Sequence, residues 1–476
     1  SQEETMFARI HIISGMFVIL TCMVVSNVPA QTTWYVATNG NDSVNTGTNG
    51  WDDAFLTISN AVANSASLDT ILVGAGEYVL TAAITIPVGK DIHVLGVNGP
   101  SNTVINGNYP TFEIQGIYAW DGRIGGFTIT NAYYHPASSA DGGGVYLGAS
   151  AMMTNCILEG NYAGRYGGGA LVYGGILSNC IVRGNRAGYG GGVMARSAGQ
   201  VLNCWIENNV CTNYGGGIYL MEGSLASNCV FAGNTSGTYG GGCALANNNA
   251  LVTDCVISGN VAGTTAGGIV VSSGSVLRNS IICCNRAKAN QNYAGGGVYM
   301  QHTNSLMLNC LVYGNEAPNG GGGGVCMLHD ADIDACTIVS NSAGVAGGGI
   351  YTYWASSIGD ARLFIRNSIV YSNAAPDGPN WSGFNTQYTW FTNSCITNPT
   401  MPQGSGNITA YPEFIDPVAN NYRLADGSPC INAGLNQEWM TDDVDLDGRQ
   451  RLDRFTRQVD MGCYEYVLRG TMFNLR

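Results

Sequence analysis

The most informative stretch of this chain reads Asn155-Cys156-Ile157-Leu158-Glu159-Gly160-Asn161 and is followed by Gly167-Gly168-Gly169. Runs of the same kind return about every 25 residues, which marks them as copies of one structural unit. The copies begin at Asn179-Cys180, Asn203-Cys204, Asn228-Cys229, Asp254-Cys255, Asn279-Ser280, Asn309-Cys310, Ala335-Cys336 and Asn367-Ser368. Self-similarity with this period predicts stacked units that share one continuous core.

Each repeat is too short for two helices with their loops, and it is rich in glycine and β-branched residues. Two or three short strands separated by tight turns fit better. Stacking pairs each strand with its counterpart one repeat later, in parallel and in register, with equivalent residues roughly 4.8 Å apart. Glycine makes up 68 of 476 residues, an excess that suits sharp turns and close backbone packing. The sequence therefore predicts an all-β parallel β-helix of roughly ten or more coils.

Equivalent positions of successive repeats form columns, and two of these columns predict which side chains point into the core and which form the turns. The residue two after the Cys position is apolar in every copy, so it shares an inward strand face with Cys. This column contains Leu158, Val182, Ile206, Phe231, Ile257, Ile282, Val312, Ile338 and Val370. The Asn that ends each run predicts a ladder of stacked turn amides. The ladder contains Asn161, Asn185, Asn209, Asn234, Asn260, Asn285, Asn315, Asn341 and Asn373.

The column directly after Cys is also apolar. It contains Ile157, Ile181, Trp205, Val230, Val256, Ile281 and Leu311. Either the strand bends there and turns both columns inward, or a hydrophobic stripe lies on the outer surface. The bend is the favoured interpretation.

Composition and local signals divide the chain. Residues 6–30 have the charged start, apolar stretch and small-residue cleavage site of a secretory signal peptide. Residues 1–5, which precede it, are expected to be an upstream or cloning remnant. Residues 31–108 are expected to form an N-terminal cap, with a short helix over 55–66 and the first strands. Residues 109–397 are expected to form the coils, and residues 398–476 are expected to form a small C-terminal capping module. The mature chain is predicted to be exported and to lack a transmembrane segment.

The net charge of the chain is −13, and no stretch is strongly basic. A nucleic-acid partner is therefore not expected. Removal of residues 1–30 leaves fifteen cysteines, an odd number, so at least one stays unpaired or pairs between chains. Buried Cys in the repeat column is expected to behave as a small hydrophobic residue.

Tyrosines supply the first candidate binding site. Tyr166, Tyr189, Tyr214 and Tyr239 each precede a Gly run on four successive coils. They form either a ladder that binds sugar rings or a self-stacked column that rigidifies a turn, because aromatic pairs stabilise each other without a ligand.

Acidic residues supply two further candidates. Asp332 and Asp334 share a strand face, and Arg366 follows about one coil later, so these three residues are the catalytic candidates if the protein cleaves polysaccharide. A solvated turn is the alternative interpretation of this cluster. Asp443, Asp445 and Asp447 have the opening spacing of a calcium loop, and Ca²⁺ is the one cofactor that the sequence suggests. Position twelve is Arg454 instead of a bidentate Glu, which excludes a helix–loop–helix site.

The N-terminal segment and the coils resemble the secreted right-handed parallel β-helix proteins of bacteria, the pectate-lyase-like superfamily. The Gly-Gly-Gly and x-x-x-Asn elements are similar to repeats of polymorphic outer-membrane adhesins. Three terminal stretches resemble the choice-of-anchor Q domain that follows β-helices in many surface proteins. They read Asp426-Gly427-Ser428-Pro429-Cys430-Ile431-Asn432-Ala433-Gly434, Asp445-Leu446-Asp447-Gly448-Arg449-Gln450-Arg451 and Val459-Asp460-Met461-Gly462-Cys463-Tyr464-Glu465.

The resemblance implies a disulfide and a role for the protein. Cys430 and Cys463 stand where that domain commonly has small apolar residues, and this paired departure implies a disulfide between them. We expect a secreted or cell-surface bacterial protein that binds, adheres or displays, with polysaccharide or matrix material as its partner. The alternatives are a polysaccharide lyase or glycoside hydrolase with a site on the β-helix face, and a structural protein that assembles end to end or through its side.

Overall fold

The structure, a computed structural model, describes residues 31–135, 141–246, 249–288, 293–353, 362–384, 386–397 and 404–467. The chain divides at Gln31, and all described elements belong to the unit Thr32–Arg476. The predicted signal peptide at 6–30 and residues 1–5 lie outside the described residues. Among the described residues, no helix is both long and apolar enough to cross a membrane.

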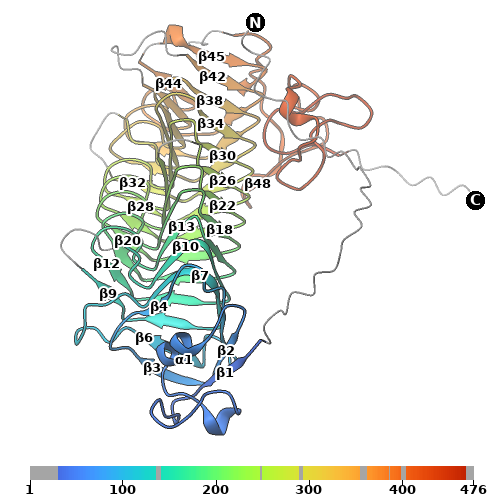
Figure 1. Ribbon diagram of the computed structural model, residues 1–476. Coiled ribbons are helices and arrows are strands. Elements are labelled where there is room, and N and C mark those ends of the chain that lie inside the picture. Colours follow the sequence, from blue (N-terminus) through green and yellow to red (C-terminus); the bar gives the residue numbers. More distant parts are fainter. Residues whose placement is uncertain are drawn as a thin grey trace, which may run out of the picture. The chain divides into compact units, whose positions relative to one another are not determined.

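Strands of the described residues form three long parallel sheets, named A, B and C, with 24, 13 and nine strands. Each coil passes through sheet C, twice through sheet A and once through sheet B, and then begins again one level along the stack (Figure 1). Equivalent residues of neighbouring coils are register partners, as in Ile157, Ile181 and Trp205. The predicted parallel β-helix is therefore confirmed.

Sheet A consists of two rows of strands, joined by N-terminal strands. The first row contains β13 (Ala170–Tyr173), β17 (Val193–Arg196), β21 (Ile218–Met221), β25 (Cys243–Ala246), β29 (Ile269–Ser272), β33 (Val298–Gln301), β37 (Val325–Met327), β41 (Ile350–Thr352) and β44 (Trp381–Gly383). The second row contains β14 (Ile176–Ser178), β18 (Gln200–Leu202), β22 (Leu225–Ser227), β26 (Leu251–Thr253), β30 (Val276–Arg278), β34 (Ser305–Leu308), β38 (Ala331–Asp334), β42 (Leu363–Arg366) and β45 (Thr389–Thr392). The N-terminal strands are β1 (Thr33–Val36), β2 (Thr70–Val73), β4 (Ile84–Ile86), β5 (His93–Gly96), β7 (Ile117–Gly125) and β10 (Val145–Thr154).

The other two sheets have shorter strands. Sheet B contains β3 (Gly76–Val79), β6 (Thr103–Asn106), β8 (Thr128–Thr130), β11 (Ile157–Glu159), β15 (Ile181–Arg183), β19 (Trp205–Glu207), β23 (Val230–Ala232), β27 (Val256–Ser258), β31 (Ile281–Cys283), β35 (Leu311–Tyr313), β39 (Thr337–Val339), β43 (Ile369–Tyr371) and β46 (Cys395–Ile396). Sheet C contains β9 (Tyr133–Tyr134), β12 (Tyr162–Ala163), β16 (Arg186–Ala187), β20 (Val210–Cys211), β24 (Thr235–Ser236), β28 (Val261–Ala262), β32 (Arg286–Ala287), β36 (Glu316–Ala317) and β40 (Ser342–Ala343). Outside these sheets lie helix α1 (Ile58–Asn64), the 3₁₀ turns η1 (Trp51–Asp53), η2 (Thr386–Tyr388) and η3 (Glu438–Met440), and the antiparallel pair β47 (Phe414–Asp416) and β48 (Asn421–Leu424).

The predicted inward face is confirmed. The nine residues of the column two after Cys have no exposed surface, and the column cysteines are also buried in the central core. The corner before each Cys is a left-handed residue, most often Asn, as at Asn155 with φ 51°. Asn and Gly accept this backbone conformation more easily than other residues, which explains why they punctuate the repeat.

The asparagine ladder is also confirmed, and it explains the Gly run. The Asn209 side-chain amide donates to Val182 O at 2.9 Å and to the Asn234 side-chain oxygen at 3.0 Å. A Cβ on Gly192 would stand 2.8 Å from the Asn209 amide nitrogen and 2.7 Å from Gly217 O. No side chain fits between the ladder and the next coil, so glycine is required there.

The favoured inward bend of the column after Cys is wrong. Ile181 is 37% exposed and Trp205 48% exposed, while their strand neighbours Val182 and Ile206 are fully buried. The strands of sheet B stay extended, and alternation then places this column outside. A hydrophobic stripe on the outer face of sheet B, the alternative interpretation, is therefore correct.

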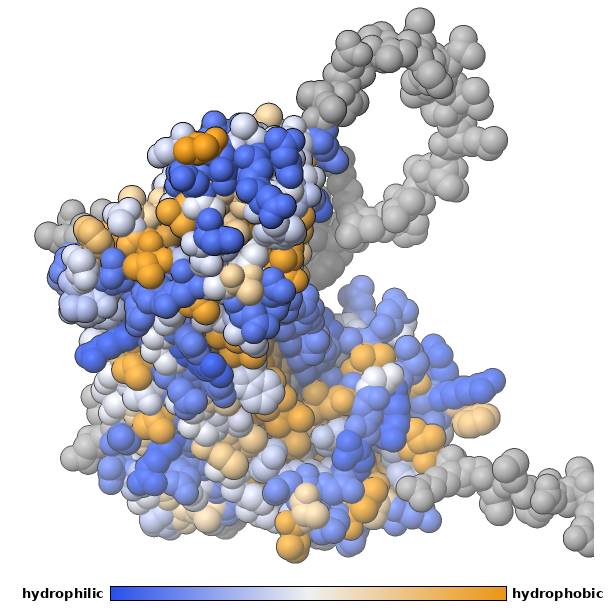
Figure 2. Space-filling view, turned by 90° about the horizontal axis from the view of Figure 1, so that it is seen from below, coloured by the Kyte–Doolittle hydropathy of each residue, from blue (hydrophilic) through white to orange (hydrophobic). Residues whose placement is uncertain are grey.

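The N-terminal cap contains the predicted helix, shortened to α1. Thr57 caps it by accepting from Asn60 N at 3.2 Å, and Ile58, Ala61 and Val62 are buried against the first coils. Strand β1 pairs in parallel with β2, so the cap already contributes strands to sheet A. Figure 2 views the molecule from this end, where hydrophilic and hydrophobic residues are mixed over the visible surface.

The C-terminal module packs on the flank of the solenoid. Its apolar residues, including Phe414 and Tyr422, form one cluster with Leu311 and Ile369 on the outer face of sheet B. Backbone bonds add to the contact, as in Gly462 N to Asn367 O at 2.7 Å. At the last coil, the core ends in the buried aromatic rings of Trp381 and Phe391 (5.7 Å between centroids). Through its contacts with Leu311 and Ile369, the module covers the distal part of the hydrophobic stripe on sheet B.

Candidate functional site

A groove runs over the outer face of the first row of sheet A. Its floor consists of the second residue of each strand from β13 to β33. These side chains point away from the central core and form a hydrophobic cluster of their own. Successive floor residues are Leu171, Met194, Tyr219, Ala244, Val270 and Tyr299. Side-chain size falls sharply at Ala244 and Val270, and the floor is lowest there.

The four predicted tyrosines form a stacked column, and three of them, Tyr166, Tyr189 and Tyr214, line one wall of this groove. Ring centroids are 5.5 Å apart for Tyr166 and Tyr189, 5.8 Å for Tyr189 and Tyr214, and 5.0 Å for Tyr214 and Tyr239. The two later pairs are nearly parallel, with interplanar angles of 5° and 15°. The structure thus contains the self-stacked column, and the faces of Tyr189 and Tyr214 are occupied by neighbouring rings. These two rings therefore offer their edges and hydroxyl groups to a ligand.

The opposite wall is polar at one end. Met221, Ser272, Gln301 and His302 line it, and the groove encloses about 320 Å³. Burial raises the pKa of Tyr219 to about 12 and also raises the pKa of Tyr214. The phenols therefore keep their protons at neutral pH and are able to donate hydrogen bonds. The groove can hold a ligand with both apolar surface and hydroxyl groups.

The sequence did not identify Ala244, Gln301 and His302 as site residues. The floor and the polar wall vary from coil to coil, whereas the tyrosines repeat. A signal existed in the register, because Ser272 and Gln301 are partners on adjacent strands. Reading the last residue of each first-row strand as a column would have found this wall.

The acidic cluster on strand β38 is divided by the C-terminal module. Asp332 faces outward and forms an ion pair with Arg366 at 3.2 Å. Asp334 is 3% exposed and accepts from Asn367 Nδ2 at 2.8 Å and Trp439 Nε1 at 3.2 Å. The two carboxylates share a strand face, as predicted, but Asp334 is covered and has no free access to a substrate.

Asp332 remains accessible from a cavity of about 430 Å³. Arg362 and Asp330 also line this cavity, and Asp330 accepts from Arg362 N at 2.7 Å. Burial raises the pKa of Asp332 against the opposing effect of Arg366. A carboxyl with a raised pKa is a group that can donate a proton.

The three carboxylates of the predicted calcium loop do not converge. Asp443 pairs with Arg278, and Asp447 pairs with Arg423 and Arg449, so that Arg423 above all lowers the pKa of Asp447. Asp445 is buried and accepts from backbone amides, including that of Glu465 at 2.8 Å. Among the described residues, no group of three or more His, Cys, Asp or Glu side chains is arranged to hold a metal. The loop carboxylates therefore do not fit a cation as a shared ligand set, and Ca²⁺ stays a prediction.

A buried charge network in the module predicts a pH-dependent stability. Burial raises the pKa of Glu465 from 4.5 to about 8 and that of Asp460 from 3.8 to about 6. Between its unfolded and its folded pKa, each of these carboxyl groups is protonated in the folded protein and ionised in the unfolded chain. The free energy of unfolding is therefore expected to fall, on the order of 6 kcal/mol, as the pH rises from 4.5 to 8.5. Melting curves across this range measure the fall.

The variant Glu465→Gln should flatten this pH dependence, because Gln mimics the protonated side chain. Glu316→Gln is the matched control, since Glu316 is exposed and paired with Arg286 on sheet C. Equal slopes for the parent and Glu465→Gln would contradict the assignment.

The predicted Cys430–Cys463 disulfide is not formed. Both thiols are free and fully buried. The Cys430 thiol is hydrogen-bonded with Cys395 of β46, whereas Cys463 is hydrogen-bonded with Thr337. The two side chains face different residues of the solenoid, so their sulfur atoms do not meet.

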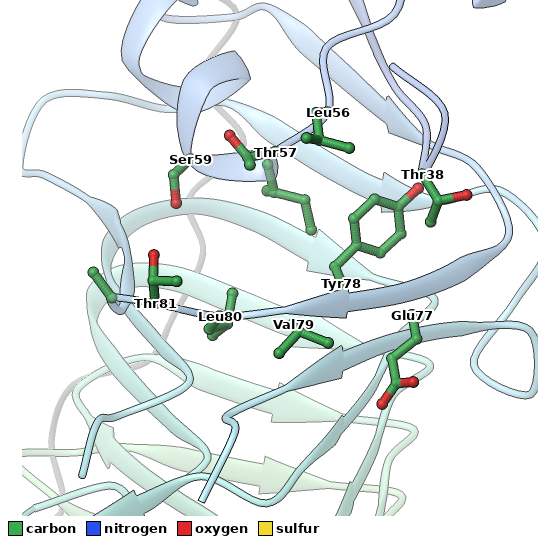
Figure 3. A pocket seen from close by; sticks show the side chains of 11 residues that line it. Thr38, Leu56, Thr57, Ser59, Glu77, Tyr78, Val79, Leu80 and Thr81 are labelled. Carbon is green, nitrogen blue, oxygen red and sulfur yellow. The ribbon is translucent and has the colours of Figure 1, made fainter. Parts of the chain in front are cut away.

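A further cavity of about 400 Å³ lies between helix α1 and strand β3 (Figure 3). Leu56, Val79 and Leu80 supply apolar surface, and the ring of Tyr78 reaches across towards Thr38. The Tyr78 hydroxyl already donates to Gly74 O at 3.0 Å. The cleft also presents the side chains of Thr57, Ser59, Glu77 and Thr81.

Comparisons with known proteins concern the fold. The model of the right-handed beta helix region matches residues 174–357. The chain is similar to pectate lyase Pel9A, with 14% identity, a TM-score of 0.42 and coverage of 93% of this chain and 98% of the other. It is also similar to a mannuronic acid specific family 6 polysaccharide lyase from human gut microbiota, with 10% identity, a TM-score of 0.38 and coverage of 79% and 91%. A PL6 alginate lyase in complex with a trisaccharide follows with 12% identity, a TM-score of 0.37 and coverage of 84% and 92%.

No curated protein gives a significant match. The family match covers successive coils of the solenoid, from β14 to β41. Together with the parallel register of these coils, it supports one structural conclusion. The chain is a right-handed parallel β-helix.

Proposed function

We propose that this is a secreted or cell-surface protein that binds a glycan in the groove on sheet A. The observation that carries the proposal is the pairing of two walls. One wall is formed by Tyr166, Tyr189 and Tyr214 of the tyrosine column, and the other presents Ser272, Gln301 and His302. Sugars combine apolar C–H faces with hydroxyl groups, and a site for them needs both kinds of surface.

The small floor residues support the same function. Ala244 and Val270 leave room over two coils, between the larger Tyr219 and Tyr299. The apolar face of a sugar ring fits over such a floor, while phenol hydroxyls and the Gln301 amide exchange hydrogen bonds with its hydroxyl groups. A glycan chain would lie along the solenoid axis, across successive coils.

Filling the groove tests this proposal. The variant Ala244→Tyr is expected to weaken glycan binding more than about tenfold, because the new ring occupies the floor. Stability should change little, since Tyr219 and Tyr299 already occupy the same column. Binding is measured by calorimetry against a panel of neutral and acidic polysaccharides, with melting curves as the folding check.

Ser258→Tyr is the matched control on sheet B, where Tyr313 stands in the same column two coils later. It should leave binding unchanged. Full binding by a folded Ala244→Tyr protein would overturn the proposed site. The polymer size is followed in the same incubations, since shortened chains would make the protein an enzyme.

A polysaccharide lyase or glycoside hydrolase is the second candidate. The observation in its favour is the cavity at Asp332, a carboxyl whose pKa burial raises beside Arg366. A general acid of a glycosidase has this property. In that case Asp332→Asn should abolish the shortening of polymer.

Export and attachment complete the proposal. Export rests on the signal-like segment 6–30, and surface attachment on the resemblance of residues 398–476 to a choice-of-anchor Q domain. Adhesion to matrix material or display at the bacterial surface would follow from both.

Lateral self-assembly is a further proposal, for which the uncovered hydrophobic stripe around Trp205 is the contact surface. A protein that sediments as a monomer even at high concentration would contradict it.

A further inference from the structure

A second aromatic stack lies on sheet C, away from the groove. Tyr109, Tyr133 and Tyr162 stack with centroid distances of 4.0 and 4.4 Å and interplanar angles of 16° and 12°. Strands β9 and β12 hold Tyr133 and Tyr162 as register partners. The rings are therefore fixed parallel to one another, at spacings close to that of the coils.

The stack stops at Tyr162. The next coil places Arg186 of β16 in register with it, and the coil after that places Val210 there. The ring of His135, on the same coil as Tyr133, also stacks with Tyr162, with 5.9 Å between centroids and an interplanar angle of 24°. Within the described ranges, no ring from a later coil stacks on Tyr162, and Arg186 makes no cation–π contact with it. Instead a cavity of about 470 Å³ opens there, lined by Tyr133, Tyr162, Gly164, Arg186, Gly188 and Thr212.

Arg186 differs from the arginines around it. Arg183 on the neighbouring strand pairs with Glu159 at 2.6 Å, and Arg286 in the same sheet C column pairs with Glu316 at 2.9 Å. Arg186 is exposed and, in the part of the chain that the structure describes, has no carboxylate partner. Its register partners are a tyrosine and a valine. The cavity thus contains a guanidinium group that is available to an anion.

We propose that Tyr162 and Arg186 form a second binding site, for a sugar ring that carries a carboxylate. The face of an aromatic ring is electron-rich and attracts the C–H bonds on the apolar face of a sugar. A sugar ring on Tyr162 extends the tyrosine stack by one member. Its carboxylate then meets Arg186, whose planar guanidinium matches a carboxylate with two parallel hydrogen bonds.

Thr212 favours a sugar over other carboxylates with a ring. Its hydroxyl donates to Gly188 O at 3.3 Å and keeps lone pairs for the hydroxyl group of a ligand. The site lies on sheet C and shares no residue with the groove on sheet A. It goes beyond the proposed function and holds whether or not the groove binds a glycan.

The full chain is titrated with a uronic acid tetrasaccharide and with the same tetrasaccharide methyl-esterified at its carboxyl groups. Arg186→Gln should weaken binding of the acid at least about tenfold and leave binding of the ester unchanged. Tyr162→Leu should weaken binding of both. Arg286→Gln, a change of the same kind in the same column, should weaken neither.

Three results would overturn the inference. In the first, Arg186→Gln binds the acidic tetrasaccharide as tightly as the parent protein does. In the second, Arg286→Gln weakens this binding as much as Arg186→Gln does. In the third, Ala244→Tyr abolishes binding of the acidic tetrasaccharide and Arg186→Gln does not. The last result would assign the acidic sugar to the groove on sheet A. Arg186 is exposed, so its variant should fold, and a melting curve checks this.

Discussion

The variant Asn209→Ala is expected to lower the free energy of unfolding by about 4 kcal/mol. The Asn209 side chain has no exposed surface and takes part in four hydrogen bonds. Its amide donates to Val182 O and to Asn234 Oδ1, and its oxygen accepts from Asn185 N at 2.9 Å and from Asn185 Nδ2 at 3.0 Å. Alanine leaves Val182 O and Asn185 N buried without this partner, and each such group costs about 1–3 kcal/mol.

Denaturant unfolding measures this loss, and hydrogen exchange locates it. Solenoid coils contact only their neighbours, so the increase in exchange should be largest in the coils that flank Asn209. Asn213→Ala is the matched control, because the amide of Asn213 is only partly buried and donates to the Thr212 hydroxyl at 3.2 Å. Equal, small effects of the two variants would show that the ladder contributes little to stability.

The variant Arg451→Met is expected to destabilise the C-terminal module by about 3–5 kcal/mol at pH 8.5. Arg451 is fully buried, pairs with Glu465 at 3.2 Å and donates twice to Gly462 O. Its removal leaves the Glu465 carboxylate in a buried site without a counter-charge. The loss should be smaller at pH 6, where Glu465 is protonated because burial raises its pKa to about 8.

Limited proteolysis and melting curves at the two pH values measure this effect. The module should become sensitive to protease while the coils stay resistant. Arg449→Met is the control, because Arg449 is 43% exposed and its pair with Asp447 is worth about 1 kcal/mol or less. Resistance of the module in a folded Arg451→Met protein would contradict the role of the buried pair.

Much of the solenoid could be predicted because residues that lie side by side in space occupy equivalent positions in successive copies of the repeat. Leu158 and Val182 occupy the same position of successive copies, and they are register partners in sheet B. Columns in the sequence therefore become columns in the structure, and the inward face and the amide ladder follow directly. The outward orientation of Ile181 could not be predicted, since apolar residues on both sides of a strand do not reveal which side is covered.

The tyrosine column could be predicted for the same reason, but the groove beside it could not. Its depth depends on Ala244 and Val270 being smaller than Tyr219 and Tyr299, and this difference in volume has no period. The polar wall at Gln301 and His302 becomes part of the site only when the first-row strands lie side by side.

The sequence by itself determined the coils, their inward face and the amide ladder, because a fixed period stacks each residue on its own copy. Only the tertiary structure decided where the C-terminal module lies. Contacts such as Asn367 with Leu435 and Arg278 with Asp443 join residues 68 and 165 positions apart, outside any repeat. The module covers Asp334 and the distal stripe and turns Cys430 towards Cys395. Packing between non-repeating surfaces depends on the shape and charge of both, and no spacing in the sequence records it.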